Sequence, residues 1–135
     1  MKKVLVAEDD FVVSKLYQMH FQRNRIHGGF FNNGAALIES AKLERPDLVI
    51  LDYEMPGLSG QEVMCQLRQI PGCEELPIIF VTGRATTQVV EHLREGGARE
   101  VLGKPFSPLH LIHLIHRFTG DPNTPDVPGP SGASS

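Results

Sequence analysis

The sequence Asp47–Gly60, DLVILDYEMPGLSG, decides the fold that we expect for the whole chain. It begins with a short apolar run, Leu48–Leu51, which is typical of a strand buried in a parallel sheet. Asp52 follows this run directly, and Met55-Pro56-Gly57 then predicts a turn. In an open α/β sheet, a carboxylate at the C-terminal end of a buried strand lies where such sheets bind their ligands. Taken alone, Asp52 is more simply explained as the first residue of an exposed loop. The rest of the sequence must therefore decide whether it belongs to a functional site.

Apolar runs alternate with helix-forming segments along the rest of the chain. The other expected strands are Val4–Ala7, Ile26–Phe31, Ile78–Val81 and Glu100–Leu102, and the expected helices are Phe11–Arg23, Ala35–Glu44, Gly60–Gln69, Thr86–Glu95 and Pro108–Phe118. Strands that alternate with helices in this way predict right-handed βαβ units. The expected fold class is therefore α/β, with a doubly wound five-stranded parallel sheet and helices on both faces. The adjacent glycines Gly28 and Gly29 predict that the second strand is irregular.

The composition predicts one soluble domain followed by a tail. The 135 residues are 41% hydrophobic and 21% charged, which is typical of a globular protein. We expect the domain to span residues 1–120, and the segment 121–135, rich in Pro, Gly and Ser, to form a disordered tail or linker. The net charge of −3 argues against nucleic acid binding by this segment. The first apolar run ends at Glu8, too early for a signal peptide or a membrane span, so we expect a cytoplasmic protein without membrane insertion.

Residues with polar side chains, or with a free backbone N–H, follow four of the five expected strands. In chain order they are Glu8 and Asp9, Asp52, Thr82 and Gly83, and Lys104. Because the C-terminal ends of parallel strands lie at one edge of the sheet, we expect these residues to converge. Carboxylates about 4 Å apart repel one another by roughly 4 kcal/mol per pair at an effective dielectric constant of about 20. Three of them together therefore require raised pKa values or a cation, and oxygen ligands favour Mg²⁺.

This constellation predicts a phosphoryl-transfer site. Asp52 would be a carboxylate nucleophile that forms an aspartyl phosphate. The three carboxylates would hold Mg²⁺, which would neutralise charge on the transferred group. The remaining phosphoryl oxygens would be bound by the Thr82 hydroxyl, the Gly83 N–H and the Lys104 ammonium.

Four motifs carry a resemblance to a known family: VLVAEDD, DLVILDYEMPGLSG, PIIFVTG and GKPFSP. Their order and spacing over residues 1 to about 120 resemble the receiver domain of two-component response regulators, the CheY-like family. The resemblance implies a flavodoxin-like sheet with the strand order 2-1-3-4-5. It also implies that a sensor histidine kinase or a histidine phosphotransfer protein phosphorylates Asp52 in a Mg²⁺-dependent reaction. Such a chain is a signalling switch and not an enzyme, because it catalyses only its own phosphorylation and dephosphorylation.

The resemblance implies further roles for residues around the acceptor. The backbone carbonyl of Glu54 would bind the metal, and the side chains of Glu54 and Arg84 would flank the phosphoryl group. Thr82 would move toward the phosphoryl group and reshape the face made by the fourth helix, the fifth strand and the fifth helix. A downstream effector, an output domain or a second copy of the chain in a homodimer would bind there. The family usually has Tyr or Phe where this chain has Val101, so the side-chain part of the switch departs from the family pattern.

Two alternatives stay open at this point. The chain is either a stand-alone receiver or phosphorelay shuttle, or the receiver half of a larger regulator whose DNA-binding or enzymatic output domain is absent from this sequence. A haloacid-dehalogenase-type phosphatase also uses a strand-end Asp and Mg²⁺. That family expects a second Asp where this chain has Glu54, and a cap domain for which the chain is too short.

Three histidines recur at every third position of the last expected helix, at His110, His113 and His116. Successive steps of three residues spread these side chains too widely around a helix to bind one metal ion. The apolar residues of the same helix lie on the opposite side, so we expect the histidines on an exposed, solvated or partner-facing surface.

Overall fold

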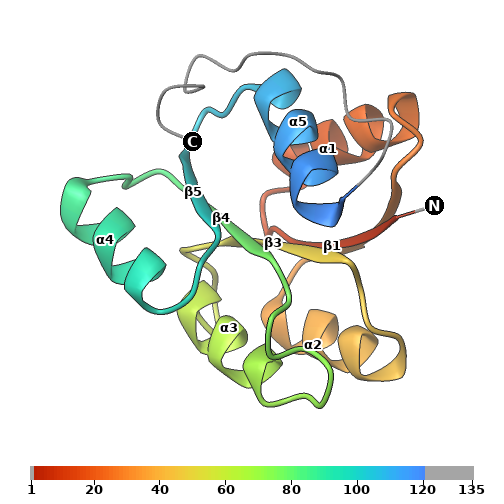
Figure 1. Ribbon diagram of the computed structural model, residues 1–135. Helices are drawn as coiled ribbons and strands as arrows, with labels where there is room; N and C mark the ends of the chain where they lie inside the picture. Colours follow the sequence, from red (N-terminus) through yellow and green to blue (C-terminus); the bar gives the residue numbers. More distant parts are fainter. Residues whose placement is uncertain (1, 121–135) are drawn as a thin grey trace.

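A five-stranded parallel sheet forms the centre of the computed structural model, which describes residues 2–120 (Figure 1). The strands are β1 (Lys3–Ala7), β2 (His27–Phe31), β3 (Leu48–Asp52), β4 (Ile78–Thr82) and β5 (Glu100–Gly103). Their order is β2-β1-β3-β4-β5, and every neighbouring pair is parallel. The predicted fold class and strand order are therefore confirmed. The expected tail, residues 121–135, lies outside the described residues.

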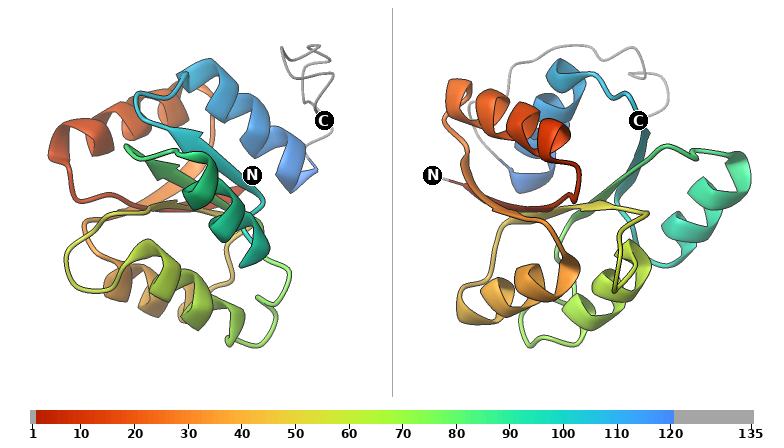
Figure 2. Two further views of the ribbon diagram at one scale, coloured as in Figure 1. Left: turned by 90° about the vertical axis from the view of Figure 1, so that its left-hand side faces the viewer. Right: turned by 180° about the vertical axis from the view of Figure 1, so that it is seen from behind.

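Helices cover both faces of the sheet, as Figure 2 shows from the side and from behind. They are α1 (Phe11–Arg23), α2 (Gly34–Leu43), α3 (Gly60–Arg68), α4 (Thr87–Glu95) and α5 (Pro108–Thr119). Helices α1 and α5 pack on one face, and α2, α3 and α4 pack on the other. Each helix follows a residue whose side chain accepts hydrogen bonds from its first turn: Asp10, Asn33, Ser59, Thr86 and Ser107. These caps fix the point at which each loop at the C-terminal edge of the sheet enters a helix.

The central strands are apolar because both of their faces are covered. Strands β3 and β4 are buried along their whole length, and β1 is buried from Val4 onward. Alternate side chains enter the two cores, so that Val49 and Leu51 face α2 and α3 while Leu48 and Ile50 face α1 and α5. A strand covered on both sides has little freedom to move. The residues at its C-terminal end are therefore held in fixed positions.

Strand β2 is regular despite its two glycines, and the expectation of an irregular strand is wrong. All five of its residues pair in register with β1. A Cβ atom at Gly28 would lie 2.6 Å from Phe30 Cζ and 2.7 Å from Phe21 Cδ2, and one at Gly29 would lie 2.8 Å from Leu5 Cδ2. The glycines thus provide the space into which neighbouring aromatic and aliphatic side chains pack.

The three histidines of α5 are half-buried, so the expectation of an exposed surface is also wrong. Helix α5 packs on the sheet through Leu111, Leu114 and Ile115, and it lies beside α1 on the same face (Figure 1). Because α5 has neighbours on two sides, its solvent-facing surface is narrower than the residue pattern alone indicates. Among the described residues, no helix has the length and apolar character needed to cross a membrane.

Candidate functional site

The strand-end residues predicted from the sequence meet at the C-terminal edge of the sheet. Asp52 is the last residue of β3 and Thr82 the last residue of β4, with 5% and 0% of their surface exposed. Glu8 follows β1 and is only 2% exposed, whereas the neighbouring Asp9 is exposed. Lys104 follows β5 and is half-buried. Two ionisable carboxyl groups are therefore buried at one point, which requires compensation by other charged groups.

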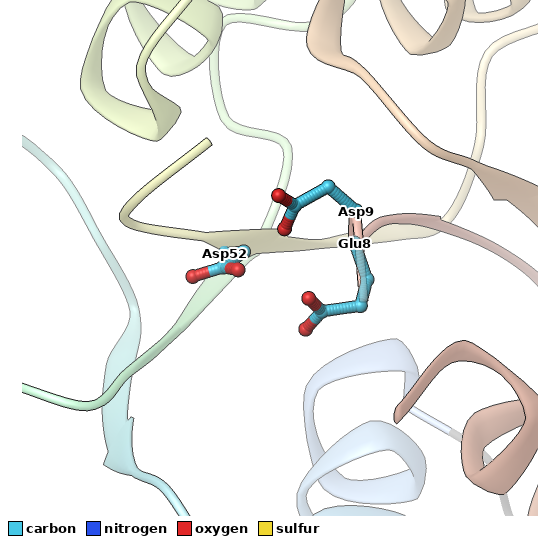
Figure 3. A group of neighbouring side chains, drawn as sticks. All are labelled: Glu8, Asp9 and Asp52. Atoms are coloured by element: carbon cyan, nitrogen blue, oxygen red, sulfur yellow. The ribbon is translucent and has the colours of Figure 1, made fainter. Parts of the chain in front are cut away.

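Three carboxylates share this edge (Figure 3). Glu8 and Asp9 come from the loop after β1, and both side chains extend toward Asp52 at the end of β3 (Figure 3). One oxygen atom from each lies within 4.8 Å of the other two. Oxygen atoms at this separation can bind one small divalent cation.

Lys104 supplies positive charge to the two buried carboxylates. Its Nζ donates a hydrogen bond to Asp52 Oδ2 at 3.1 Å and lies 3.0 Å from Glu8 Oε1. The second contact is an ion pair without hydrogen-bond geometry, and Glu8 Oε1 accepts no hydrogen bond within the described part of the chain. One ammonium does not balance three carboxylates. The remaining negative charge and the unused hydrogen-bonding capacity of Glu8 Oε1 therefore suit a divalent cation.

Burial and charge shift the pKa values of both partners in this ion pair. Burial raises the pKa of Glu8 to about 7, although the N–H of Asp10 and the Lys104 ammonium oppose the shift, and the charge of Asp52 contributes to it. Partial burial acts against the charged form of Lys104, but Glu8 and Asp52 outweigh it and raise the lysine pKa. Lys104 is thus charged at neutral pH. Glu8 therefore ionises less readily than an exposed glutamate, and another cation would stabilise its charged form.

The loops after β3 and β4 form the opening of the site. Asp52 Oδ1 accepts a hydrogen bond from Glu54 N at 3.1 Å, and Thr82 Oγ1 accepts one from Arg84 N at 2.9 Å. The side chains of Glu54 and Arg84 form an exposed ion pair, with 3.1 Å between Oε2 and Nε. Gly83 is exposed, and a Cβ atom there would have no neighbour within 4 Å among residues 2–120. The approach to Asp52 is therefore open beside Gly83 and flanked by the ion pair.

The face formed by α4, β5 and α5, expected to bind partners, has few exposed apolar side chains. Val101 is half-buried on β5 and packs against the core beneath α4. Arg94 of α4 forms an ion pair with Glu100 of β5. Among the described residues, the exposed large apolar side chains are Leu109 on α5, Leu43 on α2, and Phe11, Val12, Leu16 and Met19 on α1. Most of this exposed apolar surface thus lies on α1, which begins just after Asp9.

Residues 4–116 match the family model of the response regulator receiver domain. The chain belongs to this family. Receiver domains act in phosphorylation-based, two-component signalling, interact with histidine kinases and output effectors, and are switches rather than classical enzymes. The family membership removes the haloacid-dehalogenase-type phosphatase from the alternatives.

Several known receiver proteins are similar to this chain. The polar-differentiation response regulator DivK of Brucella anthropi is 30% identical over 120 residues, which make up 89% of this chain and 98% of DivK. The receiver domain of the Francisella response regulator 1452 superposes with a TM-score of 0.83 at 25% identity, covering 89% of this chain and 98% of its own. The receiver domain of the Pseudomonas aeruginosa sensor histidine kinase PA1611 gives 0.81 at 23% identity with the same coverage. That domain is described with a magnesium ion coordinated in its active-site cleft.

One contact beside the site was not predicted from the sequence of this receiver domain. Phe106, in the loop after β5, stacks on Tyr17 of α1, with 5.1 Å between ring centroids and 21° between ring planes. Phe106 belongs to the GKPFSP motif, and Tyr17 lies within the expected helix Phe11–Arg23. No local pattern relates the two residues, because they are far apart in the sequence.

Proposed function

We propose that Asp52 accepts a phosphoryl group from a phosphorylated histidine of a sensor kinase or a histidine phosphotransfer protein. The observation that carries this proposal is the position of the Asp52 carboxylate. It is buried at the end of β3, lies 3.1 Å from an ammonium group, and shares its edge of the sheet with two further carboxylates. A carboxylate held in this way is an oriented nucleophile, and the surrounding charges suit the binding of a phosphoryl group.

The proposed transfer forms one bond and breaks another. A carboxylate oxygen of Asp52 attacks phosphorus as the P–N bond to the donor histidine breaks. The imidazole leaves with the bonding electron pair and takes up a proton from solvent. The N–H of Glu54 orients the acceptor carboxylate, and Lys104 is placed to neutralise the added oxygens. In dephosphorylation, water attacks the same phosphorus atom as the P–O bond to Asp52 breaks. The carboxylate leaves with the bonding electron pair, and inorganic phosphate is released with a proton lost to solvent.

The three carboxylates are the proposed Mg²⁺ ligands, with the backbone carbonyl of Glu54 as a further ligand. The donor atoms of the three side chains are all oxygens and lie within 4.8 Å of one another, and Glu8 Oε1 is buried and accepts no hydrogen bond from residues 2–120. These features fit a hard divalent cation. When bound, Mg²⁺ supplies charge neutralisation for the transferred phosphoryl group.

Thr82 is the proposed link between the phosphoryl group and the partner-binding face. Its hydroxyl accepts the Arg84 N–H, and its carbonyl accepts the Lys104 N–H at 2.8 Å. A contact between this hydroxyl and a phosphoryl oxygen would replace its hydrogen bond with Arg84 N. The loop that leads from Arg84 to α4 would then be free to change its position. Val101 has no ring that could turn inward, so we propose that the backbone at the ends of β4 and β5 transmits the change. An effector, an output domain or a second copy of the chain would bind the α4, β5 and α5 face.

The exposed apolar residues of α1 are the proposed contact surface for the phosphodonor protein. Val12, Leu16 and Met19 follow helical spacing on one side of α1, and Phe11 lies beside them at the start of the helix. Their position next to Asp9 places apolar surface at the rim of the acceptor site. A protein that delivers a phosphoryl group to Asp52 must cover this rim, and burial of apolar side chains would stabilise the complex.

Labelling with a small phosphodonor tests the proposed acceptor. Acetyl phosphate and Mg²⁺ should add one phosphoryl group to the wild-type chain, and EDTA should prevent it. Asp52→Asn keeps a side chain of nearly the same size but lacks the nucleophilic carboxylate, so we expect no labelling of this variant. Stoichiometric labelling of Asp52→Asn, detected by intact-mass spectrometry, would contradict the assignment.

The domain limits of residues 1–120 and 121–135 are part of the same proposal. If an output domain follows residue 135 in the full-length gene, the chain is the receiver half of a larger regulator. If none follows, it is a stand-alone receiver or a phosphorelay shuttle. The full-length coding sequence decides between these two forms without changing the proposed chemistry of Asp52.

A further inference from the structure

The short segment that carries Lys104 is held on both of its sides. On the N-terminal side, Lys104 N donates a hydrogen bond to Thr82 O at 2.8 Å, which ties the end of β5 to the end of β4. On the C-terminal side, the ring of Phe106 stacks on Tyr17. Ser107 then caps helix α5. The backbone of Lys104 thus lies between a hydrogen bond to the sheet and an aromatic contact with α1.

Tyr17 is a rigid support for this contact. It is 2% exposed, and its ring also packs edge-on against Phe21, with 6.2 Å between centroids and 72° between planes. Phe21 is 1% exposed and contacts Phe30 of β2 at 5.4 Å. Four rings therefore form a continuous row from the Lys104 loop to the edge strand. Aromatic pairs of this kind stabilise a particular geometry beyond the area that they bury.

The position of the lysine backbone matters because the charged end of its side chain contacts two fixed groups. Lys104 Nζ lies 3.0 Å from Glu8 Oε1 and 3.1 Å from Asp52 Oδ2. A lysine side chain is long and flexible, so holding it against two partners costs rotamer entropy, and a fixed backbone limits the further freedom that must be lost. Tyr17 lies in the core between the sheet and helices α1 and α5. Burial raises the pKa of its phenol most, and the negative charges of Glu8 and Asp52 raise it further. The phenol is therefore uncharged and acts here through its ring.

We propose that Tyr17 is a positioning residue, whose ring, stacked on Phe106, holds Lys104 between Asp52 and Glu8. For its effect on reaction rate, this inference rests on the phosphoryl transfer proposed above. The alternative role of Tyr17 is to fill volume in the core between α1, α5 and the sheet. The two roles make different predictions, because a leucine fills most of the same volume but offers no ring to Phe106.

The first experiment measures the rate of Asp52 phosphorylation by acetyl phosphate at saturating Mg²⁺. Tyr17→Leu and Phe106→Leu should each lower the rate about three- to tenfold, the range that corresponds to the interaction of one aromatic pair. Tyr17→Phe keeps the ring and should stay within about twofold of wild type. In a Lys104→Ala background, Tyr17→Leu should change the rate less than about twofold, because the group that it positions is gone. Two results would overturn the inference. One is that Tyr17→Leu lowers the rate by the same factor with and without Lys104, and the other is that Tyr17→Phe lowers it as much as Tyr17→Leu does.

The second experiment does not depend on phosphorylation. In protein labelled with ¹³C-lysine, the Lys104 Cε–Hε signal reports the motion of the side chain, and Lys104→Arg assigns it. We expect this signal to become more mobile in Tyr17→Leu and Phe106→Leu but not in Tyr17→Phe, while the signal of the distant Lys42 stays unchanged. An immobile Lys104 in the folded Tyr17→Leu protein would refute the positioning role. A mobile Lys104 in a chain that acetyl phosphate does not label would support the positioning role and reject the proposed function.

Discussion

Lys104 Nζ lies 3.1 Å from Asp52 Oδ2 and so joins two residues that are 52 positions apart in the chain. The contact crosses β4 in the sheet, because β4 lies between β3 and β5. Lys104 also contacts Glu8, which belongs to the loop after β1. A single ammonium group therefore connects the ends of three strands at the site of the proposed chemistry.

Removal of this ammonium group should slow phosphorylation of Asp52. We expect Lys104→Ala to lower the rate of labelling by acetyl phosphate about a hundredfold, because one preorganised positive group at the transferred oxygens is lost. Lys42→Ala is the matched control, since Lys42 is an exposed lysine paired with Glu39 on α2. The control should be labelled at the wild-type rate. If both variants keep that rate, Lys104 does not contact the transferred group.

The raised pKa of Glu8 predicts how stability depends on pH. The folded state holds the Glu8 proton up to about pH 7, whereas an unfolded chain releases it near pH 4.5. The contribution of this group is fully present below pH 4.5 and is lost as pH rises through 7. Without metal, wild type should therefore lose up to about 3 kcal/mol of unfolding free energy relative to Glu8→Gln between these limits. Urea unfolding in EDTA from pH 5 to 8 checks this, and a constant difference between the two proteins would contradict it.

Loss of the Thr82 hydroxyl should separate phosphorylation from the response of the partner-binding face. Thr82→Ala keeps the Asp52 carboxylate and Lys104, so acetyl phosphate should still label it. The change in amide NMR shifts along α4 and β5 on phosphorylation should be largely lost, because the hydroxyl contact is the proposed link between the phosphoryl group and this face. Such links between two sites typically change an equilibrium by about fivefold or more. Thr87→Ala, at an exposed position of α4, is the control and should respond like wild type. Full shift changes in Thr82→Ala would show that the signal takes another route.

The apolar surface of α1 should affect protein donors but not small ones. Phe11 is 72% exposed, so Phe11→Ser should change stability little. With a histidine phosphotransfer protein that labels the wild-type chain, we expect the variant to react at least about fivefold more slowly, because an aromatic contact is lost. With acetyl phosphate, the rates should be equal. Leu43→Ser removes a similarly exposed side chain from α2 and should be neutral with both donors. Equal loss in Phe11→Ser and Leu43→Ser would argue against a specific surface on α1.

Gly28 should not tolerate a side chain. The added Cβ of Gly28→Ala would lie 2.6–2.7 Å from ring atoms of Phe30 and Phe21. Phe30 is half-buried and can shift, but Phe21 is 1% exposed and is confined on all sides. We expect a loss of about 1–3 kcal/mol in the free energy of unfolding, measured in urea. Gly83→Ala has open space around the new Cβ atom, so its stability should match that of wild type. Equal stability of both variants would mean that Phe21 and Phe30 can shift at little cost in free energy.

The fold could be predicted because the strands of this sheet are encoded locally. Apolar runs such as Leu48–Leu51 and Ile78–Val81 are continuous because helices cover both faces of the sheet, and the capping residues mark the helix starts. The convergence of Glu8, Asp9, Asp52 and Lys104 could be predicted as well, since each lies at or just after the end of an expected strand. Their convergence follows from the parallel arrangement of the strands and not from any single motif.

Other features depend on contacts that no local pattern encodes. The glycines of β2 indicated an irregular strand, yet Phe21 and Phe30 fill the space that Gly28 leaves. The histidines of α5 were expected in solvent, but the neighbouring helix α1 partly covers that helix. The stacking of Tyr17 on Phe106 joins α1 to the loop after β5. In each case, the decisive neighbour comes from a distant part of the sequence.

The late position of Lys104 in the chain has a consequence for biosynthesis. A ribosome releases the segments that contain Glu8, Asp9 and Asp52 well before the segment that contains the lysine. Until β5 joins the sheet beside β4, the carboxylates lack their protein cation and repel one another. An incomplete chain that ends before Glu100 therefore carries Asp52 without the ammonium group of Lys104. Under the proposed function, the site is complete only when the last strand is in place.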